Sequence, residues 1–190
     1  MARVIVNPRE LFDHLRHPRK RPVLRGITRS ESPPEQHLFD YVDRESHYVW
    51  GKRYLLTVAE SDEPPSIELK QSRMLLRVRP RTNEGKRQAL VEEWYREQIK
   101  KTVPPLIAEW ESRVGVKVER FFVQQMKTRW GSCNYKAHTI RLNTELAKKP
   151  RKCLEYVVVH EMVHLLEPTY NARFTGLLDR LAVRHEHWGY

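Results

Sequence analysis

Alternating apolar and polar residues in the first half of the chain predict β-strands. Residues 52–58 (KRYLLTV) and 73–79 (RMLLRVR) carry this alternation, which is typical of strands with one buried face. The acidic and proline-rich stretch 61–65 separates them, followed by a short apolar segment at 67–69. We therefore expect a small antiparallel sheet in this part of the chain.

Apolar residues then recur at helical spacing, which predicts a long helix beginning at about Lys86. Two consecutive prolines, Pro104 and Pro105, fall inside it. Proline lacks a backbone donor and clashes with the preceding turn, so we expect a kink or an interruption there. The apolar pattern resumes towards Trp110, and Gly115 supplies a left-handed C-terminal cap.

The second half of the chain predicts two more strands and two more helices. Residues 116–126 and 138–143 alternate as strands do. A mostly apolar helix follows, with Pro150 suited to its first turn and Pro168 ending it. Asn171 is a plausible N-cap for a second, amphipathic helix. The fold class that these elements predict is α+β.

Length and composition favour one soluble domain. A chain of 190 residues can bury a core without disulfides, and we expect a single domain over residues 47–190, preceded by a basic, Pro/Arg-rich arm at 1–46. The two cysteines form no close pair, which is typical of a reducing, cytoplasmic setting. No apolar run has the length of a signal peptide core or a membrane span, so we expect no membrane contact.

The formal net charge of +11 points to an anionic partner. Nucleic acid, nucleotides and acidic proteins are the usual partners of such a surface. The alternative is that the excess is spread over a solvated surface, since lysine and arginine are scattered along the chain. Both interpretations stay open.

The apolar helix contains the candidate chemistry, His160-Glu161-Met162-Val163-His164. Residues four apart lie on one helix face, so both imidazoles can reach one metal ion. Zinc is the usual occupant of such a pair, and Glu161 beside it is placed to act as general base. The alternative is a pair of hydrogen-bonded core histidines with a salt-bridged glutamate.

Three blocks in this order resemble the YgjP-like metallopeptidase domain family, a group of zinc-dependent hydrolases related to SprT-like metalloproteases. The blocks are KTRWGSCN from Lys127, IRLNTELAKKP from Ile140 and CLEYVVVHEMVHLLEPTYNARF from Cys153. The resemblance implies a zincin-like fold, in which a small twisted antiparallel or mixed sheet packs on a long helix and on a buried HExxH metal helix. It also implies an edge strand that binds an extended substrate.

That edge strand falls on residues 129–133 and makes Arg129, Trp130 and Ser132 the candidates for substrate binding. Arg129 and Trp130 serve equally well as structural anchors, because the role of exposed strand residues depends on their position in the sheet.

The resemblance also implies a third zinc ligand, a histidine six residues after His164, but Tyr170 stands there. A tyrosine can pack with its hydroxyl hydrogen-bonded, bind the metal weakly through oxygen, or stabilise an oxyanion. Glu167, His185 and His187 are the other candidate ligands, because catalytic zinc needs three protein ligands and an open position.

Three functions follow. The first is a zinc-dependent peptidase in which Glu161 is the base for attack of water on an amide bond. The second is hydrolysis of a nucleoside triphosphate with Mg²⁺ or Mn²⁺, although no glycine-rich phosphate loop is present. The third is a degenerate, non-catalytic binding module, for which Tyr170 is the main argument.

Overall fold

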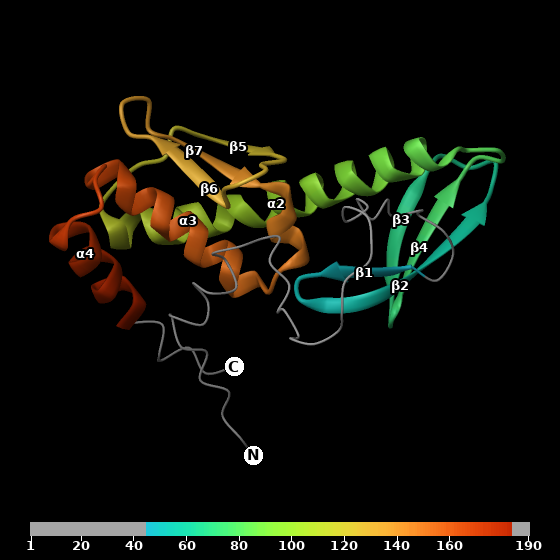
Figure 1. Ribbon diagram of the computed structural model, residues 1–190, viewed down its shortest axis with the longest axis horizontal. Helices are drawn as coiled ribbons and strands as arrows, with labels where there is room; N and C mark the ends of the chain where they lie inside the picture. Colours follow the sequence, from blue (N-terminus) through green and yellow to red (C-terminus); the bar gives the residue numbers. More distant parts are fainter. Residues whose placement is uncertain (1–44, 184–190) are drawn as a thin grey trace, which may run out of the picture.

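A computed structural model describes residues 45–183, which form an α+β fold of two small mixed sheets and three α-helices. The longest helix runs along the molecule, with one sheet at one end and the second sheet and the other two helices at the other (Figure 1). The candidate chemistry lies at the second end.

The first sheet is mixed rather than antiparallel. Its strands are β1 (Ser46–Val49), β2 (Lys52–Glu60), β3 (Ser66–Lys70) and β4 (Arg73–Val78), in the order β1-β2-β4-β3. β2 and β4 are parallel, and the prediction of an antiparallel sheet is wrong. The alternation of apolar and polar residues determines which face of a strand is buried, but it does not determine which strand pairs with it. β4 buries every second residue completely, so it takes the centre, and the less buried β3 takes the edge.

Helix α2 (Glu84–Val114) continues through Pro104 and Pro105, so the predicted interruption does not occur. Both prolines lie on the exposed face. The carbonyls that lose their helical donors are those four residues earlier, on the exposed Lys100 and Lys101, where water can replace the missing N–H groups.

Both ends of α2 are capped by residues that lie directly beside the helix in the sequence. Asn83 Oδ1 accepts a hydrogen bond from Lys86 N at 3.0 Å. Gly115 adopts φ 79° and donates its N–H to Glu111 O at 2.9 Å, which confirms the predicted left-handed cap. The buried stripe of α2 consists of Val91, Tyr95, Ile99, Val103, Ile107 and Trp110.

The second sheet gives the site its edge strand. It contains β5 (Arg120–Gln124), β6 (Gly131–Asn134) and β7 (Thr139–Asn143), in the order β5-β7-β6. The strands predicted within 116–126 and 138–143 are confirmed as β5 and β7. Among residues 45–183, β6 pairs with β7 on one side only, so its other side is a sheet edge that no described strand covers.

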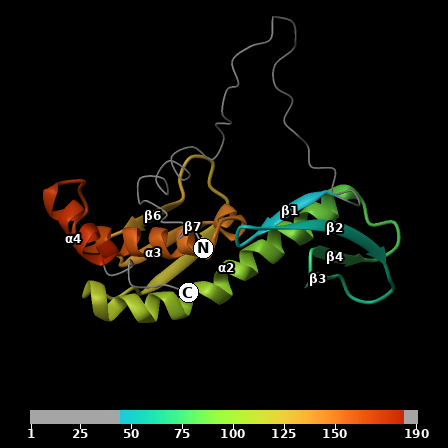
Figure 2. The same ribbon diagram turned by 90° about the horizontal axis from the view of Figure 1, so that it is seen from below.

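The chain then passes through a 3₁₀ helix, η1 (Thr144–Lys148), into α3 (Arg151–Leu166) and α4 (Ala172–Val183). α3 packs against β6, β7 and α2 (Figure 2). Asn171 Oδ1 accepts from Phe174 N at 2.9 Å, which confirms its role as the N-cap of α4.

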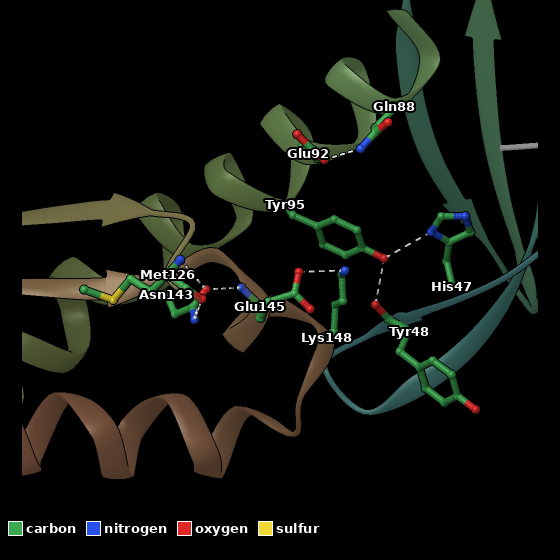
Figure 3. A network of polar contacts seen from close by, with 9 residues as sticks. All are labelled: His47, Tyr48, Gln88, Glu92, Tyr95, Met126, Asn143, Glu145 and Lys148. Carbon is green, nitrogen blue, oxygen red and sulfur yellow. Dashed lines mark hydrogen bonds and ion pairs between the residues drawn. The ribbon is translucent and has the colours of Figure 1, made fainter. Parts of the chain in front are cut away.

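Polar contacts of Tyr95 join the first sheet to α2, close to the Glu145–Lys148 pair of η1 (Figure 3). The Tyr95 hydroxyl donates to Tyr48 O at 2.9 Å and lies 3.5 Å from His47 Nδ1. Burial, helped by the nearby Lys148 ammonium, lowers the pKa of His47 to about 4, although Glu45 Oε2 lies 3.6 Å from its Nε2. The imidazole is therefore neutral at pH 7.

The predicted arm, residues 1–46, lies almost entirely outside the described residues, and β1 begins at Ser46. The candidate ligands His185 and His187 also lie outside them. Within residues 45–183, no helix combines the length and hydropathy that crossing a bilayer requires.

Candidate metal centre

Helix α3 places His160 and His164 side by side. Their ring centroids are 4.8 Å apart and the rings are nearly perpendicular, at 81°. Phe174 of α4 stacks on His164 with a centroid distance of 4.2 Å and touches His160 edge-on at 5.1 Å. The two imidazoles therefore share one face of α3, and α4 fixes their orientation.

His164 is oriented by the end of its own helix. Its Nδ1 lies 3.1 Å from the carbonyl oxygen of Glu167, the C-cap residue of α3. With the proton on Nδ1 donated to that carbonyl, the lone pair of Nε2 is left for a metal. Burial lowers the pKa of His164, and the bond to the Glu167 carbonyl opposes this only in part. The ring is thus neutral, with a tautomer defined by its bond to the Glu167 carbonyl.

His160 faces Tyr170. Its Nε2 lies 3.2 Å from the Tyr170 hydroxyl, and its buried Nδ1 has no hydrogen-bond partner among residues 45–183. Burial and the neighbouring His164 lower the pKa of His160 to about 4, so this ring is neutral as well. The unpartnered Nδ1 costs free energy, whereas Nε2 is the nitrogen that faces the Tyr170 hydroxyl.

Tyr170 covers the two histidines from the solvent side. It is 76% exposed, and its ring lies 4.6 Å from that of His164. Burial of its hydroxyl end and the charge of Glu161 raise the pKa of the phenol. Without a nearby cation, Tyr170 therefore keeps its proton at neutral pH.

Glu161 is the most perturbed carboxyl of the site. Only 6% of it is exposed, and burial raises its pKa to about 8, against the opposing effect of the Arg129 guanidinium. No side chain of residues 45–183 forms a hydrogen bond with this carboxylate. A carboxyl whose pKa lies near neutrality can both accept and return a proton.

Gly131 lets the edge strand approach Glu161. A Cβ atom at this position would lie 2.6 Å from Glu161 Oε1 and 2.9 Å from Val157 Cγ1. Only glycine fits here, because real Cβ atoms do not approach other atoms so closely. Sequence reasoning missed this role; the glycine inside a short strand next to the motif was the available signal.

Asn143, at the end of β7, anchors the loop that leads into β6. Its amide nitrogen donates to Met126 O at 2.9 Å and to Arg129 O at 2.7 Å. Its Oδ1 accepts from Met126 N at 3.3 Å and from Glu145 N at 3.1 Å. This side chain, 1% exposed, therefore fixes the start of the edge strand, a role that sequence reasoning also missed.

The candidate substrate residues divide between two places. Arg129 and Trp130 precede β6, and the ammonium of Lys149 lies 5.6 Å from the Trp130 ring centre. Ser132 lies within β6, but strand alternation turns it away from the α3 side on which Gly131 meets Glu161. Arg129, whose charge acts on Glu161, is thus the member of the three for which the structure shows an effect on the site.

The donor set fits a metal ion only if Tyr170 takes part. Residues 45–183 contain no group of three or more His, Cys, Asp and Glu side chains that could hold one. Glu167 follows the last residue of α3, its carboxylate accepts from Thr169 Oγ1 at 2.9 Å, and it forms no such group with the two histidines. In contrast, the 3.2 Å between His160 Nε2 and the Tyr170 hydroxyl is close to the edge of a tetrahedral zinc site, about 3.3 Å for bonds of about 2.0–2.1 Å.

The model of the YgjP-like metallopeptidase domain family matches residues 18–188. The chain belongs to this family. Membership of the YgjP-like family supports a metal-dependent, peptidase-like function, and it implies a divalent metal, typically zinc.

Among solved structures, the chain is similar to the metallopeptidase zymogen abylysin of Pyrococcus abyssi. The two share 20% sequence identity over 42% of this chain and 78% of that chain, with a TM-score of 0.39. Comparison with curated proteins gave no match.

Proposed function

We propose that this protein is a zinc-dependent peptidase of the zincin type, in which His160, His164 and Tyr170 hold the metal and Glu161 is the general base. The arrangement of His160 Nε2 and the Tyr170 hydroxyl, 3.2 Å apart beside the buried Glu161, carries this proposal. Zinc in such a site acidifies water and polarises the scissile carbonyl.

Glu161 moves the proton. Its raised pKa lets it take a proton from the attacking water and return it to the leaving amine at neutral pH. Its carboxylate faces Gly131 of β6, where an extended peptide adding to the free edge would place its backbone near the same carboxylate. Arg129, just before this strand, offers a positive charge to the developing oxyanion.

The zinc content of the protein and of its variants tests whether His160 and Tyr170 bind the metal. Elemental analysis of the purified protein should give about one zinc per chain, as three protein ligands and an open position are what catalytic zinc requires, and His160→Ala should lose it. Tyr170→Phe should weaken zinc binding, and Tyr170→His should strengthen it, since imidazole is the better zinc ligand. Tyr135→Phe, an exposed tyrosine on the β6–β7 turn, is the matched control. Equal zinc affinity in all three tyrosine variants would remove Tyr170 from the site.

The rate of peptide hydrolysis tests whether Glu161 is the general base. Glu161→Gln should keep zinc and lower peptide hydrolysis by about 10²–10⁴-fold, the usual contribution of a general base. Glu119→Gln, a solvent-exposed glutamate before β5, is the control. Undiminished hydrolysis by Glu161→Gln would exclude its role as base.

The nucleotide hypothesis is separated by substrate and metal on the same preparation. Hydrolysis of peptides with Zn²⁺ supports the proposal. Hydrolysis of nucleoside triphosphates with Mg²⁺ or Mn²⁺, and of no peptide, would replace it. A zinc-loaded protein that cleaves neither would instead be a binding module.

A further inference from the structure

Within residues 45–183, some basic residues form ion pairs and others gather in short segments without them. Along α2, basic residues such as Arg96, Lys100 and Arg113 each lie within 4 Å of a glutamate. Three other segments, 50–53 (WGKR), 127–130 (KTRW) and 149–152 (KPRK), contain seven basic residues and no acidic residue. None of these seven forms an ion pair with any carboxylate of residues 45–183.

The three segments lie side by side. Trp50 N donates to Ala147 O at 2.8 Å, and the Arg151 guanidinium lies 5.3 Å from the Trp50 ring centre. On the other side, the Lys149 ammonium lies 5.6 Å from the Trp130 ring centre. They therefore form one continuous strip, here called the basic–aromatic surface, running from the β1–β2 turn past the start of α3 to the start of β6.

The backbone of this surface is held in place before any ligand binds. Trp50 and Gly51 form the two-residue turn between β1 and β2, with φ of 51° and 80°. A Cβ on Gly51 would lie 3.0 Å from Pro150 Cγ, so the turn packs tightly on the segment before α3. At the other end, the Asn143 side chain fixes the carbonyl of Arg129. Binding here costs little ordering of the chain.

We propose that the basic–aromatic surface binds single-stranded nucleic acid. Two indole rings interleaved with unpaired cations match a strand in which bases alternate with phosphates. An acidic protein would use the cations but not the rings, and a duplex keeps its bases stacked on each other. This surface contains none of the proposed metal ligands, although Arg129 belongs to both sites, and the proposal holds whether or not the protein is a peptidase.

Binding is measured by fluorescence anisotropy of the full chain with a labelled thymidine oligonucleotide of about 20 nucleotides. Competitors are a DNA duplex of the same length and polyglutamate. The oligonucleotide should bind more tightly than either competitor. Its log Kd against log salt should have a slope magnitude of about 3.5–5 if five to seven cations contact phosphates, at about 0.7 for each contact.

The double variant Arg151→Gln/Lys152→Gln should lower that slope magnitude by about 1.4. The matched control is Lys86→Gln/Lys136→Gln, which removes the same charge from exposed lysines at the start of α2 and on the β6–β7 turn. Trp50→Leu, which removes a stacking ring, should weaken binding by about fivefold or more.

Each competitor result decides the assignment. Polyglutamate binding as tightly as the oligonucleotide would overturn it in favour of an acidic protein, and equal binding of the duplex would overturn the single-strand preference. Equal slopes for the Arg151/Lys152 variant and its control would overturn the location.

Discussion

Replacing Gly131 with alanine tests the close approach of β6 to α3. The added methyl carbon would lie 2.6 Å from Glu161 Oε1, about 0.8 Å short of ordinary van der Waals contact at 3.4 Å. It would also lie 2.9 Å from Glu161 Cγ and from Val157 Cγ1. Contacts on two sides leave no rotation of the glutamate that relieves both, so β6 and α3 must separate.

The cost follows from overpacking. Forcing an extra carbon into a packed interior costs about 1–3 kcal/mol. For a chain of this size we expect the melting temperature of Gly131→Ala to fall by about 3–9 °C. Peptide hydrolysis should fall further, by up to about 10²-fold, because a displacement near 1 Å moves the substrate edge away from Glu161.

Thermal unfolding is measured in the presence of a chelator, so that the result does not depend on metal binding. Gly176→Ala is the control, because a Cβ there meets no atom within 4 Å and the residue lies inside α4. This control should be more stable by about 0.5–1 kcal/mol, as alanine is the better helix former. A Gly131→Ala protein as stable and as active as the parent would refute the close packing of β6 on Glu161.

Three further changes probe other parts of the structure. Asn143→Asp removes the donations to the Met126 and Arg129 carbonyls and should lower the free energy of unfolding by about 1–3 kcal/mol in urea titrations; an unchanged midpoint would contradict the anchoring role. Tyr95→Phe leaves a carbonyl of β1 without its donor and should cost about 1–2 kcal/mol in the same assay, and no loss would mean that water replaces the hydroxyl. In metal-free protein, Glu161 keeps its proton to about pH 8 in the folded state but loses it near 4.5 when unfolded, so its own contribution to the free energy of unfolding should fall by about 1.5 kcal/mol between pH 6.5 and 8. The histidines with lowered pKa values act in the opposite sense but are common to both proteins, so the stability of Glu161→Gln relative to the parent should rise by about 1.5 kcal/mol over this range, and a constant difference would contradict the raised pKa.

Local patterns in the sequence predicted the elements of the fold but not all of their neighbours. Gly115 and Asn171 cap their helices as predicted, because a cap depends on residues within one turn. The position of β4 between β2 and β3 depends on which strand buries most surface, and this is decided by the whole core. Helix α2 is not interrupted because Pro104 and Pro105 are exposed, and their exposure likewise follows from tertiary packing.

The candidate site divides in the same way. Helical spacing alone places His160 and His164 on one face, and the structure brings Tyr170 to them through the turn after α3. The contact between Gly131 and Glu161 joins residues thirty positions apart. No local pattern encodes that contact, so sequence reasoning did not find the role of the glycine in RWGSC.

The continuity of α2 has a consequence for how the protein unfolds. Its 31 residues span about 45 Å, and its buried stripe belongs to the same apolar cluster as Met74 in the first sheet and Val158 in α3. Separation of the first sheet or of α3 from α2 would expose apolar side chains of this shared cluster. Neither end of the molecule can therefore unfold without destabilising the other. We therefore expect one cooperative melting transition, and a fragment cut before Asn83 should not retain a stable catalytic half.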